Sequence, residues 1–443
     1  MKKIFTIILI VGLTQNLFAQ DTTSRKIDEL LSAYAKLNKF NGSALVAWHG
    51  KVIFEKGYGF SDVSGKKLNE PYTIFQIASV TKQFTSAVVL KLVELKKIAL
   101  TDKLSKYYPD FPQADKITIE NLLTHTSGIY DYTHEDTVTK LDNEQKMISF
   151  LKKKKRDFEP GTNWSYSNSG YSILGFIIQK VSGITYERAV RKYIFDPLHM
   201  GHSGFDFERL QSKEKSTGYS VFNDSVKTVA TLNDSSVVFA AGAIYSTVGD
   251  LYKWHEGLQS YQIVKKELMD KAYTPFKRNY GFGWVIDSIY GKRMIYHSGG
   301  ISGFSSNFAR ITEDDACIAL LNNKEGPGLE TINREIMAIL YKQPYNVPKK
   351  KQAINLPLDV LAKYVGTYDL QTPKMMLEMS VNNGKLLAHA INGPTFPLSA
   401  EKENFFYIQE GLVEIEFVIS SDGKVDHIVV SQGGQKNQGK KIK

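Results

Sequence analysis

Ser79-Val80-Thr81-Lys82 is the stretch that decides the fold, because it places a serine and a lysine three residues apart where a loop runs into a helix. Residues at this spacing share one face of a helix, so the lysine amine lies beside the serine hydroxyl. An amine in that position is one means of activating a weak nucleophile. The pattern needs support from its context, because Ser-x-x-Lys starts at six positions: Ser64, Ser79, Ser149, Ser212, Ser399 and Ser421.

The residues after this tetrapeptide predict a long helix. Apolar residues recur at helical spacing from Thr81 to Ile98, which indicates one buried face. A helix that begins at Ser79 places the hydroxyl at the helix N-terminus, where the helix dipole favours developing negative charge. The buried stripe consists of Phe84, Val88, Leu92 and Leu95.

Strand-like segments lie on both sides of this helix in the sequence. Ser43 to Trp48 and Val52 to Phe60 flank His49-Gly50-Lys51, which predicts a hairpin. Strand patterns return at Tyr280–Ile289, Met294–Tyr296, Ser306–Ile311 and Ala316–Leu321. Helical patterns occupy Ser24–Leu37, Ser172–Val181 and Leu329–Tyr341. We therefore expect residues 20–342 to form one α/β unit, whose sheet uses both ends of the segment and whose middle is a helical insert.

The C-terminal part predicts a separate small β-barrel. Residues 343–357 contain three prolines and three consecutive lysines, which is typical of a linker. Turns at Asn383-Gly384 and Asp422-Gly423 separate short strands, as in hairpins, so we expect a barrel over residues 358–432. Residues 433–443 are rich in Gly, Gln and Lys and are expected to be a frayed tail. The predicted strands are Tyr364–Leu370, Met376–Val381, Lys385–Ile391, Asn404–Tyr407, Leu412–Ile419 and His427–Val430.

Length, charge and cysteine content narrow the possible classes of protein. A chain of 443 residues predicts two or three domains. The net charge is +10, and much of the excess lies in short basic runs such as Lys152–Arg156, which favour solvated faces over nucleic-acid binding. Cys317 is the single cysteine and lies in an apolar run, so we expect a buried strand residue and not a nucleophile.

The N-terminus predicts a secretory signal peptide. Lys2-Lys3 precede the apolar run Ile4 to Leu13, and Leu17-Phe18-Ala19 offers a small residue at the cut. This run is too short to span a bilayer, which needs about 20 apolar residues. Cleavage after Ala19 removes two lysines and no acid, so the charge falls from +10 to +8. We expect an exported protein, periplasmic or secreted, with no lipid anchor and no integral membrane segment after cleavage.

Two further motifs follow Ser79 in order. Tyr166-Ser167-Asn168 is the single Tyr-x-Asn of the chain. His297-Ser298-Gly299-Gly300 directly follows a predicted strand, whereas the other His-Ser-Gly, at His202, lies in a loop. The set parallels S-x-x-K, S-D-N and K-T-G, in which a serine nucleophile is flanked by two polar motifs.

With these motifs the chain resembles the serine β-lactamase and penicillin-binding-protein superfamily over residues 25–342. Within it, the chain is most similar to the branch of class C β-lactamases, D-alanyl-D-alanine carboxypeptidases, D-aminopeptidases and related esterases. The resemblance implies an antiparallel sheet flanked by helices with a helical subdomain, and the barrel resembles a lipocalin-like domain through Tyr364-Val365-Gly366-Thr367-Tyr368. Supporting segments are Phe75–Ala78, Leu122–Gly128, Phe158–Gly161, Ala241-Gly242, Ser246-Thr247, Asp250-Leu251 and Tyr280–Trp284.

The resemblance implies a role for each motif residue. Ser79 would be acylated, Lys82 would help to remove its proton, and Tyr166 would act as general base through its phenolate and then as acid. A phenol ionises near neutral pH only beside cations, and Lys82 and His297 offer such a setting. The N–H groups of Ser79 and Gly300 would form an oxyanion hole. The residues expected to bind substrate or the oxyanion are Asn168, His297, Ser298, Gly299 and Gly300.

One departure bears on the substrate. His297 stands where many β-lactamases have a lysine that grips a carboxylate, and histidine there looks more like certain D-amino-acid peptidases. We expect an exported serine hydrolase that forms an acyl-enzyme with an amide, either a peptide or a D-amino-acid derivative, cell-wall fragments included. An esterase or weak β-lactamase with the same residues, and a non-catalytic ligand-binding protein, remain alternatives. We expect no metal or organic cofactor: His125 is expected to be structural, and His199 and His202 lie too near each other in an irregular loop to argue for zinc.

Overall fold

The computed structural model describes two compact units, Met1–Val347 and Pro348–Lys443. The predicted signal peptide, residues 1–19, lies outside the described residues. Among the residues that are described, none belongs to a helix with the length and hydropathy needed to cross a bilayer. The described residues are 22–135, 141–326, 328–371, 374–391, 393–408, 413–432 and 435–442.

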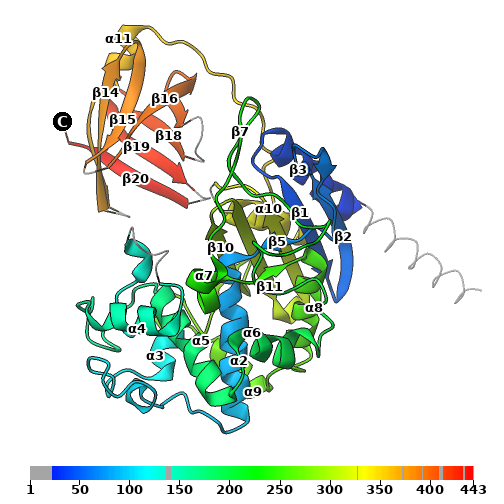
Figure 1. The fold of residues 1–443 in the computed structure, drawn as a ribbon. Coiled ribbons are helices and arrows are strands. Elements are labelled where there is room, and N and C mark those ends of the chain that lie inside the picture. The colour runs from blue at the N-terminus through cyan, green and yellow to red at the C-terminus, as the bar shows by residue number, and fades with distance from the viewer. Residues whose placement is uncertain are drawn as a thin grey trace, which may run out of the picture. The chain divides into compact units, whose positions relative to one another are not determined.

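The first unit is built on an antiparallel sheet made from both ends of its sequence. Over the described ranges the strand order is β2-β1-β12-β11-β10-β9. β1 pairs with β12, so that Leu45 lies opposite Ala319, and the dark blue strands therefore lie beside the yellow-green ones in Figure 1. The predicted joining of the two ends is confirmed. The strands are β1 (Gly42–Trp48), β2 (Lys51–Tyr58), β9 (Val285–Ile289), β10 (Lys292–Ile301), β11 (Phe304–Ile311) and β12 (Ala316–Asn322).

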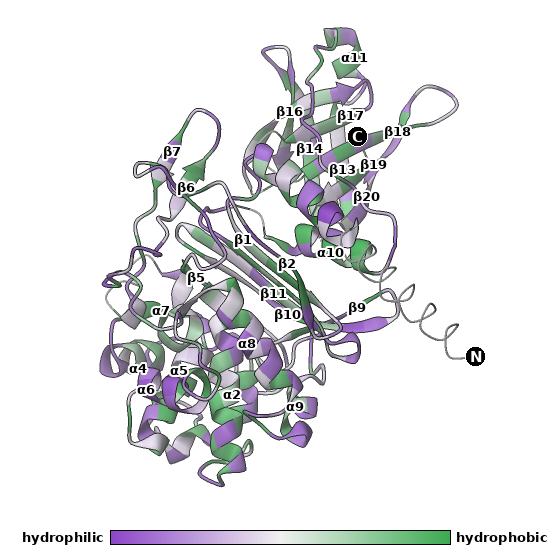
Figure 2. Ribbon diagram, turned by 90° about the vertical axis from the view of Figure 1, so that its right-hand side faces the viewer, coloured by the Kyte–Doolittle hydropathy of each residue, from purple (hydrophilic) through white to green (hydrophobic). Residues whose placement is uncertain are grey.

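Both faces of this sheet are apolar and covered by helices, so the unit has three layers. Side chains alternate along a strand, and Ala44 and Val46 pack with the helix of residues 22–36 and with α10 (Glu330–Leu340). Leu45 and its neighbours on the opposite face pack with the helical layer. Figure 2 shows α10 on one side of the sheet, with α2 and α8 on the other. The central strands β1, β12 and β11 are accordingly buried almost throughout, whereas the outer strands β2, β10 and β9 are partly exposed.

The helical layer surrounds α2 (Thr81–Glu94), which confirms the predicted helix after Ser79, although α2 ends before the expected Ile98 and Leu95 of the predicted stripe is exposed. Its buried stripe includes Phe84, whose ring stacks on Trp254 with centroids 4.6 Å apart. The other helices of the unit are α3 (Ile119–Leu123), α4 (Glu144–Lys152), α5 (Asn168–Ser182), α6 (Tyr186–Val190), α7 (Ser235–Gly242), α8 (Val248–Gln259) and α9 (Lys266–Ala272). Short strands complete it: β3 (Phe60–Asp62), β4 (Lys67–Leu68), β5 (Phe75–Gln76), β6 (Tyr219–Phe222), β7 (Lys227–Val229) and β8 (Tyr245–Ser246).

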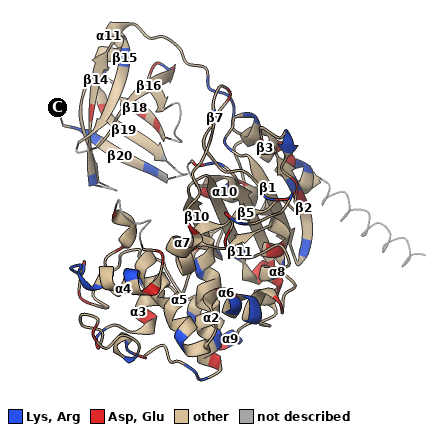
Figure 3. Cartoon of the chain, in the orientation of Figure 1, with Lys and Arg blue, Asp and Glu red and all other residues tan. Residues whose placement is uncertain are grey.

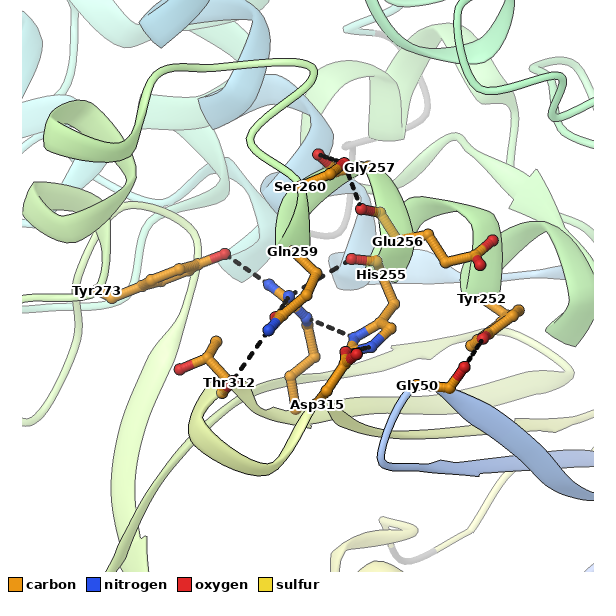
Figure 4. Close-up of polar contacts among 11 residues, drawn as sticks. Gly50, Tyr252, His255, Glu256, Gly257, Gln259, Ser260, Tyr273, Thr312 and Asp315 are labelled. Atoms are coloured by element: carbon orange, nitrogen blue, oxygen red, sulfur yellow. Dashed lines mark hydrogen bonds and ion pairs between the residues drawn. The ribbon is translucent and has the colours of Figure 1, made fainter.

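A buried polar cluster joins the sheet to α8. Arg310 of β11 is fully buried, and its guanidinium donates to Nδ1 of His255 at 2.8 Å, to the Tyr273 hydroxyl at 2.8 Å and to Oε1 of Gln259 at 2.9 Å. Since Nδ1 of His255 accepts, its proton lies on Nε2, 2.9 Å from a carboxylate oxygen of Asp315 (Figure 4). Burial, helped by Arg310, lowers the pKa of His255 to about 2 and keeps it neutral. The cluster therefore fixes α8 against β11 by hydrogen bonds.

The basic run after α4 is largely paired with nearby carboxylates. Figure 3 marks this segment in blue beside α4. Lys154 contacts Glu135 at 2.6 Å and Arg156 contacts Glu159 at 3.6 Å, while Lys152 pairs with Asp110. The segment is an ion-paired surface of this unit.

The second unit is a closed antiparallel barrel of eight strands in the described part of the chain. Its interior is filled by aliphatic and aromatic side chains, with the ring of Tyr364 4.4 Å from that of Phe417. The strands are β13 (Gly366–Gln371), β14 (Lys374–Asn382), β15 (Lys385–Ala390), β16 (Thr395–Lys402), β17 (Phe405–Ile408), β18 (Val413–Ile419), β19 (Val425–Gln432) and β20 (Gln435–Lys441). One short helix, α11 (Leu358–Ala362), precedes them.

The expected frayed tail over residues 433–443 is wrong for β20. This strand pairs with β13 and with β19, and thereby closes the barrel. Its sequence, QKNQGKK, lacks the apolar alternation that predicts a strand. The strand forms nevertheless, because backbone hydrogen bonds pair it with its neighbours. β16 was likewise absent from the prediction, since a proline interrupts its pattern at Pro397.

Candidate active site

Ser79 lies in a short 3₁₀ turn, Ala78–Val80, that leads directly into α2. Ala78 has φ +46°, a left-handed conformation that costs a residue with a side chain about 1–3 kcal/mol. Hydrogen bonds to Ile77 hold the turn, because its carbonyl accepts from Oγ of Ser306 at 2.7 Å and its N–H donates to the carbonyl of Ile244 at 3.0 Å. The strained turn is thus clamped between the sheet and the segment before β8, which fixes where the Ser79 hydroxyl points.

Lys82 has a completely buried side chain with three hydrogen-bond partners. Its Nζ donates to Oγ of Ser79 at 3.1 Å, to Oδ1 of Asn168 at 2.8 Å and to the carbonyl of Ala241 at 2.9 Å. Burial lowers the pKa of Lys82 to about 7, although the nearby charge of Asp131 acts in the opposite direction. The amine is therefore poised to gain or lose a proton near neutral pH while it contacts the serine.

Tyr166 lies against both of these residues. The Nζ of Lys82 is 4.8 Å from the centre of the Tyr166 ring. Burial raises the pKa of Tyr166, and a hydrogen bond with Ser79 only partly opposes this effect. The phenol is therefore protonated at rest, which differs from the expected phenolate.

Asn168 begins α5 and is oriented by Asp131, a residue that the sequence analysis did not identify. One carboxylate oxygen of Asp131 accepts from the Asn168 backbone N–H at 3.0 Å and from its side-chain amide at 3.1 Å. This leaves Oδ1 of Asn168 to face Lys82. Asp131 is 4% exposed and lies 37 residues before Asn168, so no local pattern marks it.

His125 holds the segment that carries Tyr166. Its carbonyl accepts from the N–H of Ser165 at 3.1 Å and its Nδ1 accepts from the N–H of Ser167 at 3.0 Å. Its ring lies 4.4 Å from the Tyr166 ring. Burial lowers the pKa of His125 far below its ordinary value, so the ring is neutral and its proton is on Nε2. His125 supports the site from behind, consistent with the expected structural role.

The third motif lies on β10, beside the nucleophile turn. A side chain at Gly299 would come within 2.3 Å of the Ile77 carbonyl and 2.4 Å of Oγ of Ser306, so only glycine fits this approach. Gly300 lines the cleft and has open space where a side chain would be.

His297 does not line this cleft. Its Nδ1 donates to the carbonyl of Ser298 at 2.6 Å, and its Nε2 accepts from the Tyr280 hydroxyl at 2.9 Å. Burial, reinforced by Lys82, lowers the pKa of His297 to about 3. The residue is neutral and lends no positive charge to Tyr166, contrary to the expected cationic setting.

These side chains open into a cleft of about 870 Å³. Ser79, Tyr166 and Asn168 line it on one side, and Ser298 and Gly300 line it on the other. Among the described lining residues there is no lysine or arginine, and Glu325 carries a carboxylate.

Other residues considered from the sequence lie in structural surroundings. His202 belongs to a loop held by Asp250, whose carboxylate accepts from the His202 N–H at 2.8 Å and from Oγ of Ser203 at 2.9 Å. Cys317 is buried in β12, and burial raises the pKa of its thiol. No group of His, Cys, Asp or Glu side chains suited to a metal ion occurs in the described residues.

The fold and this site define a class of protein, the penicillin-binding-protein-like serine hydrolases. The family model described as Beta-lactamase matches residues 27–341, and the chain belongs to that family. Penicillin-binding protein 4* of Bacillus subtilis (strain 168) is 27% identical over 450 residues, which cover 93% of this chain and 97% of that protein.

Two solved structures share the fold. The octameric penicillin-binding protein homologue from Pyrococcus abyssi has a TM-score of 0.69 and 26% identity, and the match covers 94% of this chain and 99% of that one. The D-amino acid amidase from Ochrobactrum anthropi SV3 has a TM-score of 0.63 and 22% identity, over 72% of this chain and 99% of that one. At 22% identity, the similarity to the amidase shows the fold alone.

Proposed function

We propose that this protein is an exported serine hydrolase that cleaves an amide through an acyl-enzyme on Ser79. The observation that carries the proposal is the contact of Ser79 with a buried Lys82 whose pKa is about 7. A lysine so tuned is neutral in a useful fraction at physiological pH, as a general base requires. The export rests on the N-terminal sequence.

In the proposed acylation, Oγ of Ser79 attacks the amide carbon and its proton passes to neutral Lys82. The lysine keeps its bonds to Asn168 and Ala241, which hold it in place as it becomes charged. Because Tyr166 is protonated at rest, it donates its proton to the leaving nitrogen as the C–N bond breaks, and it regains one from Lys82. Water then attacks the ester by the reverse sequence, which releases the acid and restores Ser79.

The N–H groups of Ser79 and Gly300 are proposed to bind the oxyanion in both steps. Gly300 lines the cleft on β10, and Ser79 lines it within the 3₁₀ turn Ala78–Val80. One such donor is typically worth about 10²–10³ in rate. The close approach at Gly299 sets the spacing of the two groups.

An amide of a peptide or of a D-amino acid is the proposed substrate. A D-amino acid amidase shares the fold, and the cleft lacks a lining cation to grip a carboxylate in the described residues. Ester hydrolysis or weak β-lactam turnover by the same residues is the second candidate, because Ser79 and Lys82 serve either leaving group.

Labelling with a fluorescent fluorophosphonate tests the nucleophile. We expect the parent to be labelled and Ser79→Ala to be unlabelled. Ser149→Ala is the matched control, because Ser149 belongs to an exposed Ser-x-x-Lys on α4 and should leave labelling intact. Equal labelling of all three proteins would refute the assignment. D-amino-acid amides, peptides, esters and a penicillin then rank the substrate classes, and the N-terminal sequence of the exported protein, expected to start at Gln20, tests export.

A further inference from the structure

The hydroxyl of Ser298, in the third motif, donates its hydrogen to another side chain of the protein. It donates this hydrogen to Oε1 of Glu330, because a carboxylate only accepts. The same oxygen accepts from Nδ2 of Asn307 at 3.1 Å. The Asn307 amide cannot turn over, since its Oδ1 accepts from Nδ2 of Asn333 at 2.8 Å. Ser298 therefore has only a lone pair left to offer a molecule in the cleft.

Two carboxylates and one ammonium group lie on this side of the cleft, so its net charge is negative. Glu330 lies in the first turn of α10 and Glu325 lines the cleft. Oε1 of Glu325 accepts from the N–H of Gly303 at 2.9 Å, which holds its carboxylate near β10 and β11. The Nζ of the nearby Lys324 donates to the carbonyl of Asn38 at 2.8 Å, and it lies 3.5 Å from the place that a side chain of the cleft-lining Gly326 would take.

A substrate carboxylate placed beside Ser298 would meet a hydrogen-bond acceptor and the carboxylate of Glu330 without receiving a hydrogen, while Glu325 adds a second negative charge at the turn after β10. Like charges at short range repel, and a charged group that loses water without gaining a partner is strongly disfavoured. A protonated amine has the opposite charge and the opposite hydrogen-bond direction, since it only donates. The groups on this side of the cleft match it in both charge and hydrogen-bond direction.

We propose that the β10 side of the cleft, formed by Ser298, Glu325 and Glu330, binds a protonated amino group of the substrate and excludes a carboxylate. The inference rests on the proposed function and narrows it to amino-bearing amides. Glu330 acts as a specificity-determining residue by taking the Ser298 hydrogen.

Two boronic acids that differ in one substituent test this pairing. 3-(Aminomethyl)phenylboronic acid and 3-carboxyphenylboronic acid both form a reversible adduct with a serine nucleophile, and calorimetry measures their Kd without turnover. We expect the amine to bind at least about tenfold more tightly, the difference that a single charge-assisted hydrogen bond typically makes. Glu330→Ala should tighten binding of the carboxylate and reduce the preference about tenfold.

Three further variants test whether the preference for the amine depends on the charge of Glu330, on the Ser298 hydroxyl or on acidic residues elsewhere. Glu330→Gln keeps the side-chain shape and guards against misfolding of Glu330→Ala, and it should also reduce the preference. Adding Ser298→Ala to Glu330→Ala should abolish the gained carboxylate affinity, since that gain depends on the freed hydroxyl. Glu313→Gln removes an exposed acid elsewhere in the unit and should leave the preference unchanged.

The outcomes also separate this inference from the proposed function. Tighter binding of the carboxylate by the parent, or an unchanged preference in both Glu330 variants, would overturn the inference while Ser79 remains the nucleophile. Failure of both boronic acids to bind, together with no fluorophosphonate labelling, would overturn the proposed function and the inference with it.

Discussion

His125 brackets Tyr166: its carbonyl binds the N–H of the preceding residue, its Nδ1 binds the N–H of the following residue, and its ring lies 4.4 Å from the tyrosine ring. The backbone of His125 has φ +58°, which suits asparagine better than most residues. The orientation of the phenol toward Ser79 therefore depends on a residue outside the three motifs.

His125→Ala should slow acylation about 10²-fold, because it frees the segment around Tyr166 and a small misplacement is costly in rate. Fluorophosphonate labelling kinetics measure the effect. His125→Asn is the matched variant, since its amide oxygen replaces Nδ1 as the acceptor and tolerates the left-handed backbone, so it should recover most of the rate. Equal rates for the two variants would contradict a positioning role.

The rate of labelling should rise with pH through about 7, because neutral Lys82 is the proposed base and its pKa is about 7. Below this pH the rate should fall about tenfold per unit as the amine becomes protonated, and above it the rate should level off. Lys82→Arg, which stays charged, should be inactive at every pH. A flat profile between pH 5 and 8 in the parent would exclude Lys82 as the titrating group.

Asp131→Asn should shift the pH range in which the labelling rate rises to lower pH. The charge of Asp131 raises the pKa of Lys82, so its removal favours the neutral amine. The maximal rate should also fall, because asparagine has one acceptor oxygen in place of the two that accept from Asn168 and from Thr133. The labelling profile from pH 5 to 9 reports both changes, and a rise that moves to higher pH would refute the electrostatic argument.

Arg310→Met should reduce the free energy of unfolding of the first unit by about 3–5 kcal/mol, since it leaves His255 and Tyr273 without their buried partner. Urea denaturation measures the loss. Lys266→Met is the control, because its ion pair with Asp270 is exposed and its loss should leave the free energy of unfolding close to that of the parent. Similar losses in both variants would argue against the buried cluster.

Ending the chain at residue 434 should open the barrel, because β20 pairs with both β13 and β19 and its loss leaves two unpaired edges. Hydrogen exchange at β13 and β19 should become fast, and the protein should aggregate more readily. A chain that ends at residue 441 keeps the strand and should behave as the parent does. Unchanged protection after the longer deletion would show that the barrel does not need β20.

Short stretches of sequence were sufficient to predict most helices and strands and to identify the three motifs. The helix after Ser79 and the strands on either side of it follow from apolar spacing, which a short window of sequence records. The order of Ser79, Tyr166 and His297 along the chain indicated the superfamily. The pattern did not reveal β20, since its residues are polar and its pairing with the neighbouring strands uses backbone hydrogen bonds.

Only the tertiary structure decided what each motif residue does. Burial, which no local pattern reports, sets the pKa of Lys82 near 7, keeps Tyr166 protonated and makes His297 neutral. Asp131 acts on its partner through a hydrogen bond between segments far apart in the sequence. The sequence by itself identified Ser79, Lys82, Tyr166 and Asn168, whereas desolvation and hydrogen-bond direction, properties of the packed structure, added Asp131, removed His297 from the cleft and determined the chemistry of the site.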